Sequence, residues 1–341
     1  MTFANRYVQI EKEATFDTAP SSTIGPAYGE CDDEGFQENF DNLTRNDMNR
    51  YGAAKSLDSK HYAEGSFSMA APPDYFTMKA LHGLYGTHTP GGTPGTGDTL
   101  TEGGTLPSYT FRIGREEKSY TYSGQVIESV AVSANIGEYA MMSFSTTGAA
   151  GSNAVASLLT PAYDYTGDAA HFAACYVNFE DVAETGEYSK LVQSIDFEIK
   201  TNRDLDNSYG LGSSTCIRAP PEQRREITGT ITFHKAVLAA DVADTEPTWN
   251  ELAAGLTQDG AAATPALSVL LYVGTADFIR FDFTKVVYDA PSTNVSGRDS
   301  QTMTVGFTAL YDAGEACMSK ITFNSSSTKF AGGGAVDLDG A

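Results

Sequence analysis

The residue types best suited to chemistry, histidine and cysteine, are few and scattered in this sequence. Five histidines and four cysteines occur among 341 residues, and none have the spacing of a metal site or a catalytic pair. The patterns G-x-S-x-G, H-E-x-x-H and the phosphate-binding loop do not occur. We therefore interpret the histidines as solvated or hydrogen-bonded groups, and the cysteines as free thiols packed as small apolar side chains. The sequence predicts neither an enzyme nor a bound cofactor or metal.

Two charged segments deserve separate interpretation. Asp204-Leu205-Asp206-Asn207 resembles the start of a calcium-binding loop, but the glycine at the sixth position and the glutamate at the twelfth are missing. A polar loop is the better interpretation. Arg218, Arg224 and Arg225 form the one basic cluster, for which we expect salt bridges to an acidic neighbouring subunit instead of contacts to nucleic acid.

The chain is strongly acidic along its whole length. Its net charge is −22, made of −9 in residues 1–160 (10 basic, 19 acidic) and −13 in residues 161–341 (12 basic, 25 acidic). Such a surface repels DNA and acidic membranes, which excludes DNA binding by phosphate neutralisation but allows a surface that DNA slides past. No apolar run reaches membrane-spanning length and the first residues do not resemble a secretion signal, so we expect no membrane contact.

The elements that carry these residues are expected to be mainly strands, and the sequence pattern of one strand pair occurs twice. Residues 120–147 and 281–309 both alternate aromatic or apolar residues with serine, threonine or aspartate, the period of a half-buried strand. Tyr120 aligns with Phe281 at an offset of 281 − 120 = 161, and Phe144 with Phe307 at 307 − 144 = 163. A fixed-period duplication of this kind indicates a repeated structural unit.

Other segments recur in the same order. Long polar loops are expected at 41–61 and 202–225, and the strands that follow them, 62–70 and 226–233, align Gly65 with Gly229 at an offset of 164. Helices are expected at 75–85, capped by Asp74, and at 249–256, and residues 87–107 are expected to be a glycine- and proline-rich loop. Scattered Asn-x-Ser/Thr sequons at Asn42, Asn294 and Asn324 are interpreted as chance occurrences.

These repeats predict a mostly β protein with two tandem β-sandwich domains, each with one flanking helix. We expect an N-terminal arm at 1–33, a first domain at 34–148, a connector at 149–190, a second domain at 191–312, and a C-terminal strand and flexible tail at 313–341.

The outward face of the predicted strands carries small hydroxyl and acidic side chains. It lacks the aromatic residues that stack bases and the basic rows that hold phosphates. An ordinary solvated sheet face and a non-adhesive wall remain equally open interpretations. The residues of this face are Glu64, Ser66, Ser68, Ser143, Ser145, Thr228, Thr230, Thr232, Asp282, Thr302 and Thr304.

With these features together, the chain resembles the tail tube proteins of long-tailed phages and archaeal viruses. Residues 11–20 (EKEATFDTAP) are similar to the opening segment of that family, and the two long loops lie where the family places its ring-stacking loop. The duplication resembles the members that fuse two domains per chain and form trimeric, pseudo-hexameric rings. The resemblance implies homotrimer rings stacked into a tube of the virion tail, assembled in the host cytoplasm.

The resemblance also implies partners and surface roles. Expected partners are the tape measure, tail terminator and baseplate proteins, and double-stranded DNA would pass an acidic lumen, lined by the outward face above, without specific binding. The residues expected to contact the next ring are Arg45, Asp47, Arg50, Asp204, Asp206, Arg218, Arg224 and Arg225. An extracellular acidic β-sandwich that binds a ligand or forms a surface layer stays open as an alternative, and an enzyme ranks last.

Overall fold

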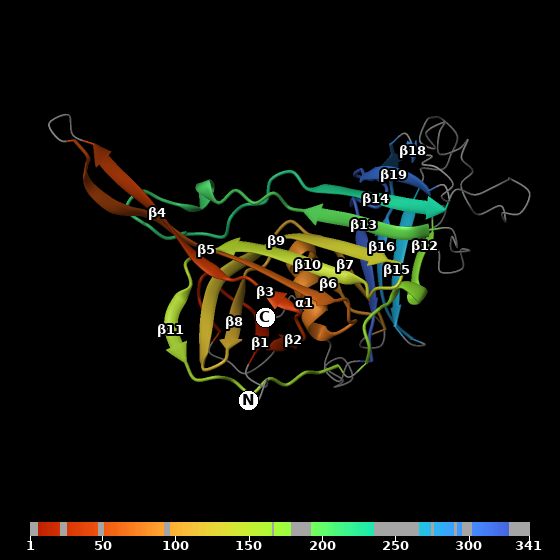
Figure 1. The fold of residues 1–341 in the computed structure, drawn as a ribbon, viewed down its shortest axis with the longest axis horizontal. Coiled ribbons are helices and arrows are strands. Elements are labelled where there is room, and N and C mark those ends of the chain that lie inside the picture. Colours follow the sequence, from red (N-terminus) through yellow and green to blue (C-terminus); the bar gives the residue numbers. More distant parts are fainter. Residues whose placement is uncertain are drawn as a thin grey trace, which may run out of the picture.

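The computed structural model describes residues 6–20, 26–46, 51–91, 96–165, 167–178, 192–234, 266–273, 276–289, 292–294 and 302–326. This part of the chain consists of two β-sheets and one α-helix, with a long hairpin that projects from one end (Figure 1). The mostly β fold predicted from the alternating pattern is therefore confirmed.

The first sheet contains a row of eight strands drawn from both halves of the sequence. In order, these are β17 (Val286–Tyr288), β19 (Thr302–Ala309), β14 (Glu226–His234), β13 (Val192–Lys200), β9 (Lys118–Asn135), β10 (Met141–Gly148), β5 (Ala53–Ala70) and β3 (Asp33–Glu34). Further strands attach at its margins: β4 (Gln37–Asn46) on β5, β18 (Ser292–Asn294) on β19, and β8 (Tyr109–Arg115), β1 (Tyr7–Lys12), β2 (Ala27–Gly29) and β11 (Ser152–Ala156) around the first part of β9.

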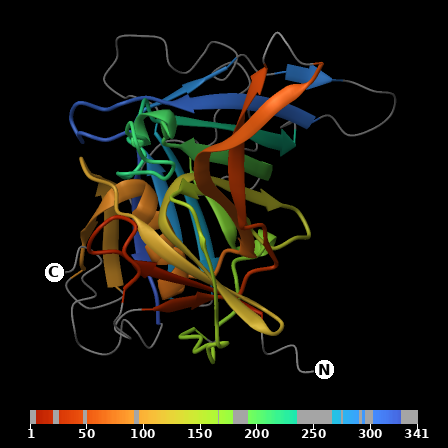
Figure 2. The ribbon, with the colours of Figure 1, turned by 90° about the vertical axis from the view of Figure 1, so that its left-hand side faces the viewer.

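The second sheet lies across the first and also joins both halves (Figures 1 and 2). Its order is β12 (Cys175–Asn178), β15 (Leu267–Val273), β16 (Asp277–Phe283), β20 (Lys320–Asn324), β7 (Thr96–Glu102) and β6 (Gly86–Thr89). Strands β6 and β7 lie in the segment expected to be a loop. That expectation was wrong because Leu100, flanked by threonines, alternates inward and is fully buried.

The helix α1 (Tyr75–Tyr85) has the bounds expected from the sequence. Asp74 caps its start by accepting a hydrogen bond from the Thr77 backbone N–H at 2.7 Å, and Gly86 ends it in the left-handed conformation (φ 82°). All residues of the helix are buried. The helix is therefore part of the core, between the first sheet and β7.

A glycine lies in the middle of a strand in each half of the eight-strand row, and its pairing partner can be compared between the halves. Gly65 pairs with Thr146 in the first half, and Gly229 with Phe307 in the second. An offset of 164 for the glycine strand and 161 for its partner (307 − 146) relates the two pairs. With Gly65 matched to Gly229, Phe307 corresponds to Thr146, two residues from the Phe144 that the sequence comparison selected.

A one-residue shift of strand register is found in both halves of the row. The register of β10 on β9 shifts by one residue between Ser145 and Thr146. The register on β19 shifts by one residue between β18 (Ser292 opposite Thr304) and β17 (Tyr288 opposite Phe307). A one-residue difference of register therefore occurs in each half of the row.

The aromatic cores of the two halves correspond in the same way. The rings of Phe36 and Tyr122 have centroids 5.3 Å apart, and those of Phe197 and Phe283 are 5.4 Å apart. Both members of the second pair lie 161 residues after those of the first. Phe36 lies between β3 and β4 and contacts Tyr122 of β9, whereas Phe197 of β13 contacts Phe283 of β16 in the second sheet. Each half therefore has its own aromatic contact.

The N-terminal segment is packed more tightly than the extended arm expected from its sequence. Glu13 is buried, and its carboxylate accepts hydrogen bonds from the Asp17 N–H (3.0 Å), Ser108 Oγ (2.8 Å), Thr110 Oγ1 (2.6 Å) and the Gly124 N–H (2.8 Å). Strand β1 pairs with β8 along its whole length. These contacts explain why residues 7–13 belong to the core.

The first of the two expected polar loops is a strand pair. Residues 41–61 form most of the β4–β5 hairpin, which leaves the body of the molecule (Figures 1 and 2). The second segment, 202–225, is irregular as expected, with a short 3-10 helix at Asp206–Ser208. Another 3-10 helix spans Phe172–Ala174. The helix expected at 249–256 lies outside the described residues.

Candidate functional site

One face of the eight-strand row is mostly polar from β5 to β19. Because alternate residues of each strand point to the same face, the residues that pair laterally with one another form rows across it. One such row crosses β5, β10, β9, β13, β14 and β19 through Ser68, Ser143, Ala131, Glu198, Thr228 and Thr308. The row passes from one half of the sequence to the other without interruption.

All but one of the residues predicted to face outward lie on this face. Glu64, Ser66 and Ser68 come from β5, Ser143 and Ser145 from β10, Thr228, Thr230 and Thr232 from β14, and Thr302 and Thr304 from β19. Each is exposed or partly exposed, whereas the residues between them are mostly buried.

Asp282 is the exception, and its predicted placement was wrong. It lies on β16 in the second sheet, is 1% exposed, and binds Arg280 Nε at 2.9 Å and Ser268 Oγ at 2.8 Å. Burial raises the pKa of its carboxyl group, while Arg280 opposes that rise. Polar and apolar residues alternate along β16 as predicted. Both faces of this strand are covered, however, so its polar residues do not mark a solvent-exposed face.

Acidic groups predominate among the charges on this face. Glu64, Asp196, Glu198 and Glu226 lie on it. Lys200 also lies on it and is bound to Glu198 at 2.9 Å. Burial raises the pKa of Asp196. The face therefore combines uncharged hydroxyls with a net negative charge.

Glu128, the extra residue at the bulge of β9, adds to the acidic character of the face. Burial raises the pKa of Glu128, and the nearby carboxylate of Glu64 raises it further. Sequence reasoning missed Glu128, and it also missed the contributions of β9 and β13 to this face. The alternation in residues 129–133 (SVAVS) and 194–200 (SIDFEIK) carried the signal for Ser129, Ser133, Asp196 and Glu198.

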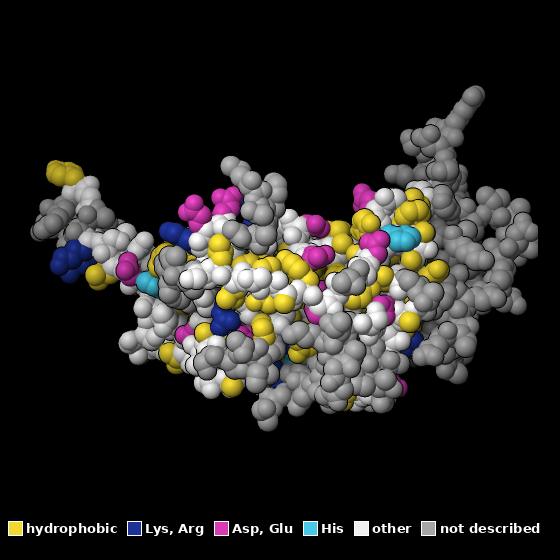
Figure 3. Space-filling view, turned by 90° about the horizontal axis from the view of Figure 1, so that it is seen from below, with side chains coloured by type: hydrophobic (Ala, Val, Ile, Leu, Met, Phe, Trp, Pro, Cys, Tyr) yellow, Lys and Arg dark blue, Asp and Glu magenta, His cyan; other side chains and the backbone are white. Residues whose placement is uncertain are grey.

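The projecting hairpin exposes an apolar ladder. Leu43 and Leu57 lie opposite each other and are 63% and 66% exposed, and Phe40, opposite His61, is 51% exposed. Beyond them, Arg45 lies opposite Lys55, and basic side chains mark this end of the molecule (Figure 3). Exposed apolar groups on a two-stranded ribbon typically mark an interaction surface.

The irregular segment 202–225 packs against the base of this hairpin. Tyr209 OH donates to the His61 carbonyl at 3.1 Å, and the His61 N–H donates to the Ser214 carbonyl at 2.7 Å. Lys60 binds Asp206 at 2.5 Å. The structure thus brings the two predicted inter-ring segments together at one end of the molecule.

The individual charged residues predicted there have different surroundings. Asp204 accepts hydrogen bonds from the Asn207 N–H and from Gln223, and Arg218 donates to the Asn207 carbonyl. Arg45, Arg218 and Arg224 are exposed. Asp47 and Arg50 lie outside the described residues.

Arg225 does not fit the predicted role of reaching a neighbouring subunit. Its side chain is 8% exposed, and it binds Glu222 at 2.9 Å, Glu102 at 3.4 Å and the Leu84 carbonyl at 2.7 Å. Its guanidinium also lies over the Tyr85 ring. These contacts tie segment 202–225 to the helix, so Arg225 is an internal brace.

The described residues contain no group of three or more histidine, cysteine, aspartate or glutamate side chains arranged to hold a metal. Within the same ranges, no helix is both long and apolar enough to cross a bilayer. All four cysteines are free thiols.

A polar sheet face fits a structural role, and comparison with protein families supports one. The model of the phage tail tube protein family matches residues 4–309. The chain belongs to the phage tail tube protein family. It is therefore a structural component of the virion tail and not an enzyme. A search of curated proteins found no match. The family match covers the strands of the eight-strand row from both halves of this tail tube protein.

Proposed function

We propose that this tail tube protein forms trimeric rings that stack into a tube, with the polar face of the eight-strand row lining the channel. The observation that carries the proposal is the continuity of that face across both halves of the chain. A channel wall has to be smooth and unbroken, and a polar row that crosses from β9 to β13 meets that need.

The recurrent register supports the trimeric ring. The row consists of β3 or β4, β5, β10 and β9, followed by β13, β14, β19 and β17, which is one four-strand unit used twice. We interpret residues 34–148 and 191–312 as two copies of one tube domain. Three chains then supply six units, and closed rotational symmetry leaves no unit without neighbours.

The chemistry of the face suits passage of double-stranded DNA. Serine and threonine hydroxyls leave the phosphates hydrated, and the carboxylates of Glu64, Glu198 and Glu226 repel them. Lys200 is neutralised by Glu198. A duplex that meets this wall therefore gains little from contact, which is what rapid transit requires.

The β4–β5 hairpin supports stacking of successive rings. It extends beyond the body, and its Leu43–Leu57 pair is exposed in the single chain. Burying this pair against the next ring would remove apolar surface from water. Segment 202–225 would hold the hairpin in place through Tyr209 and Lys60. Tube growth in the host cytoplasm and contacts with tape measure, terminator and baseplate proteins complete the proposed role.

Electron microscopy of the purified protein tests this proposal. We expect hollow tubes with sixfold density in each ring and a mass per ring of three chains. Solid fibres, flat sheets or rings of six chains would contradict it. Labelling of an introduced cysteine at Thr230 from inside intact tubes, by a small but not by a bulky maleimide, would locate the polar face.

A further inference from the structure

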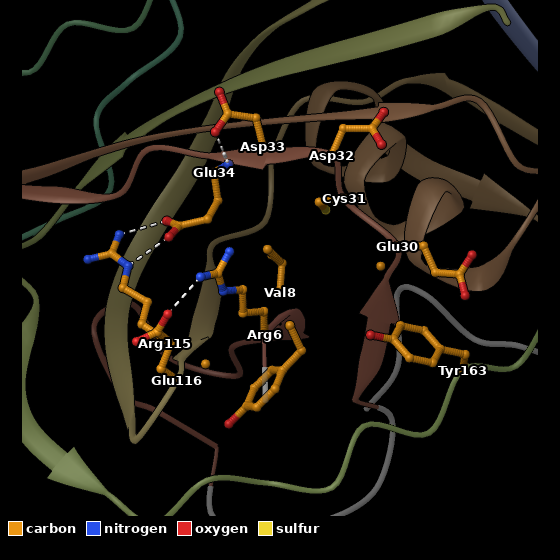
Figure 4. Close-up of a pocket in the computed structure, with 13 residues that line it drawn as sticks. Arg6, Val8, Glu30, Cys31, Asp32, Asp33, Glu34, Arg115, Glu116 and Tyr163 are labelled. Carbon is orange, nitrogen blue, oxygen red and sulfur yellow. Dashed lines mark hydrogen bonds and ion pairs between the residues drawn. The ribbon is translucent and has the colours of Figure 1, made fainter. Parts of the chain in front are cut away.

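A cavity of about 640 Å³ lies beside the free edge of the first sheet. It is bounded by Asp33 and Glu34 of β3, by Arg115 at the end of β8, and by Arg6 and Tyr163 (Figure 4). Within the described ranges β3 pairs only with β5, so its outer side faces this cavity. A strand edge next to an open space is a site where another strand can add.

Side chains of the same chain cap that edge. Gly35 N–H donates to the Ser66 carbonyl of β5, so the backbone groups of the next residue, Phe36, point away from β5. The Phe36 N–H donates to Glu34 Oε2 at 3.3 Å, and its carbonyl accepts from Arg115 Nη2 at 2.8 Å. Arg115 in turn binds Glu34 through two hydrogen bonds of 2.7 and 2.6 Å.

The equivalent edge in the second half of the chain is occupied by a strand. Phe197, equivalent to Phe36 at the offset of 161, pairs with Val132 of β9. This junction between β13 and β9 is antiparallel and joins the last strand of one four-strand unit to the first strand of the other. The chain thus contains one junction between two four-strand units, and the register of that junction is known.

We infer that the free edge at β3 and β4 receives the β18 edge of a second copy, in the register of the internal junction, and that the Glu34–Arg115 pair is a cap that this strand displaces. Transferring the Glu198–Ala131 pairing by 161 residues in each direction places Gln37 opposite Ser292 of the second copy. Among the described residues, strand β18 pairs only with β19, and the inferred contact uses its other edge. The inference rests on the proposed ring and specifies its contact.

The cap gives the edge two states. In the isolated chain, the Phe36 backbone groups are satisfied by Glu34, Arg115 and Tyr122, so the edge is not an open template for indiscriminate pairing. On ring closure, a strand supplies those hydrogen bonds, and Glu34 and Arg115 remain bound to each other beside it. The cap thus restrains pairing until a strand of matching register arrives.

Cysteine cross-linking in assembled protein tests the register. The variant Gln37→Cys with Ser292→Cys is expected to give covalent dimers and trimers on a non-reducing gel, since directly opposed antiparallel positions lie within disulfide reach. The control Gln37→Cys with Asn294→Cys shifts the pair by two residues on the same face and is expected to cross-link severalfold less. Glu198→Cys with Ala131→Cys should close within one chain and shows that this geometry can be bridged.

The outcomes separate this inference from the proposed function. Tubes that form normally while only the shifted pair cross-links, or neither pair does, would overturn the inferred register and leave the tube intact. Absence of tubes from the unmodified protein would instead overturn the proposed function. The single-cysteine variants identify any background from the native thiols.

A second variant tests the cap itself. Arg115→Ala is expected to lower the concentration at which rings form and to shorten the lag of assembly, measured by light scattering, while unfolding of the monomer changes little. Lys118→Ala is the matched control, since it removes an exposed positive charge near the cavity without touching Phe36. An unchanged or raised assembly threshold in a folded Arg115→Ala protein would overturn the cap.

Discussion

Gly65 leaves no room for a side chain on its strand. A Cβ atom at this position would lie 2.3 Å from the Phe36 ring, which is held by the Phe67, Phe111 and Tyr122 rings. We expect Gly65→Ala to lower the free energy of unfolding by about 2 kcal/mol, because the ring has to move within a packed core. Urea denaturation measures this.

The control for that substitution is Gly52→Ala near the tip of the hairpin. A Cβ atom there would meet nothing within 4 Å, so the change should stay within about 0.5 kcal/mol. Equal effects of the two substitutions would mean that the contact with Phe36 does not set the cost.

Glu13 is the residue that fastens the N-terminal segment to the core. Replacing it with alanine leaves buried donors on Ser108, Thr110 and Gly124 without their acceptor. We expect Glu13→Ala to destabilise the fold by about 3 kcal/mol and to increase amide hydrogen exchange in β1. The exposed Glu117→Ala should change neither, and loss of protection confined to distant strands would contradict this assignment.

At the scale of elements, the helix α1 begins at a carboxyl group with a raised pKa. Burial raises the pKa of Asp74 from 3.8 to about 7, and Asp164 and Glu30 add to the rise, while hydrogen bonds from Thr77 oppose it. The folded state therefore holds a proton that the unfolded state has lost between about pH 4 and 7. In that window, this group makes stability fall as pH rises, by up to about 1.4 kcal/mol per pH unit.

Asp74→Asn keeps a capping side chain but cannot ionise. We expect it to be more stable than the unmodified protein at pH 8 and to lack the decline between about pH 4 and 7. Thermal unfolding of both proteins across this range measures the difference. A difference that does not vary with pH would show that Asp74 ionises in the folded state as it does in the unfolded state.

The hairpin is expected to contribute to assembly and not to folding. Leu43→Ser combined with Leu57→Ser removes the exposed apolar pair while leaving the strand pairing in place. We expect an unchanged urea midpoint but few or no tubes by electron microscopy. Tyr311→Ser, at another exposed site, is the control and should assemble normally. Loss of the folded monomer in the double variant would count against this separation.

Elements with a strong local sequence pattern were predictable, and elements that depend on pairing with distant strands of the same chain were not. The helix 75–85 combines a capping residue with apolar spacing, and β15 is a continuous apolar run. Residues 41–61 of the β4–β5 hairpin are mostly polar and exposed, so they lack the alternation that revealed the rest of β5 as a strand. Strands β6 and β7 contain glycine and threonine and are held by β20, more than two hundred residues later in the chain. Their pairing is a tertiary effect.

At the scale of the whole molecule, the proposed channel wall can be tested by changing its net charge. Thr228→Lys with Thr230→Lys places two cations per chain on the polar face. We expect tubes that retain short DNA duplexes at low salt and release them as salt rises, because each phosphate contact releases counterions. Co-sedimentation measures this. Glu116→Lys with Glu117→Lys, on the exposed turn after β8, should not retain DNA.

The polar face was largely predictable because alternation within a single strand decides which residues share a side. Its extent was not, since the pairing of β9 with β13 joins two segments that no local pattern connects. Asp282 and Arg225 were misassigned for a related reason. Whether a polar side chain meets solvent or another chain segment depends on which sheet covers it, and that is settled only in the complete fold.

The position of β20 has a consequence for biosynthesis. This strand lies between β16 and β7 and joins the pieces of the second sheet that come from opposite halves of the sequence. Residues 320–324 must leave the ribosomal exit tunnel before these pieces can join. Strands β6 and β7 are therefore synthesised more than two hundred residues before the strand that completes their sheet, so the first half of a nascent chain waits for the second before its core can close.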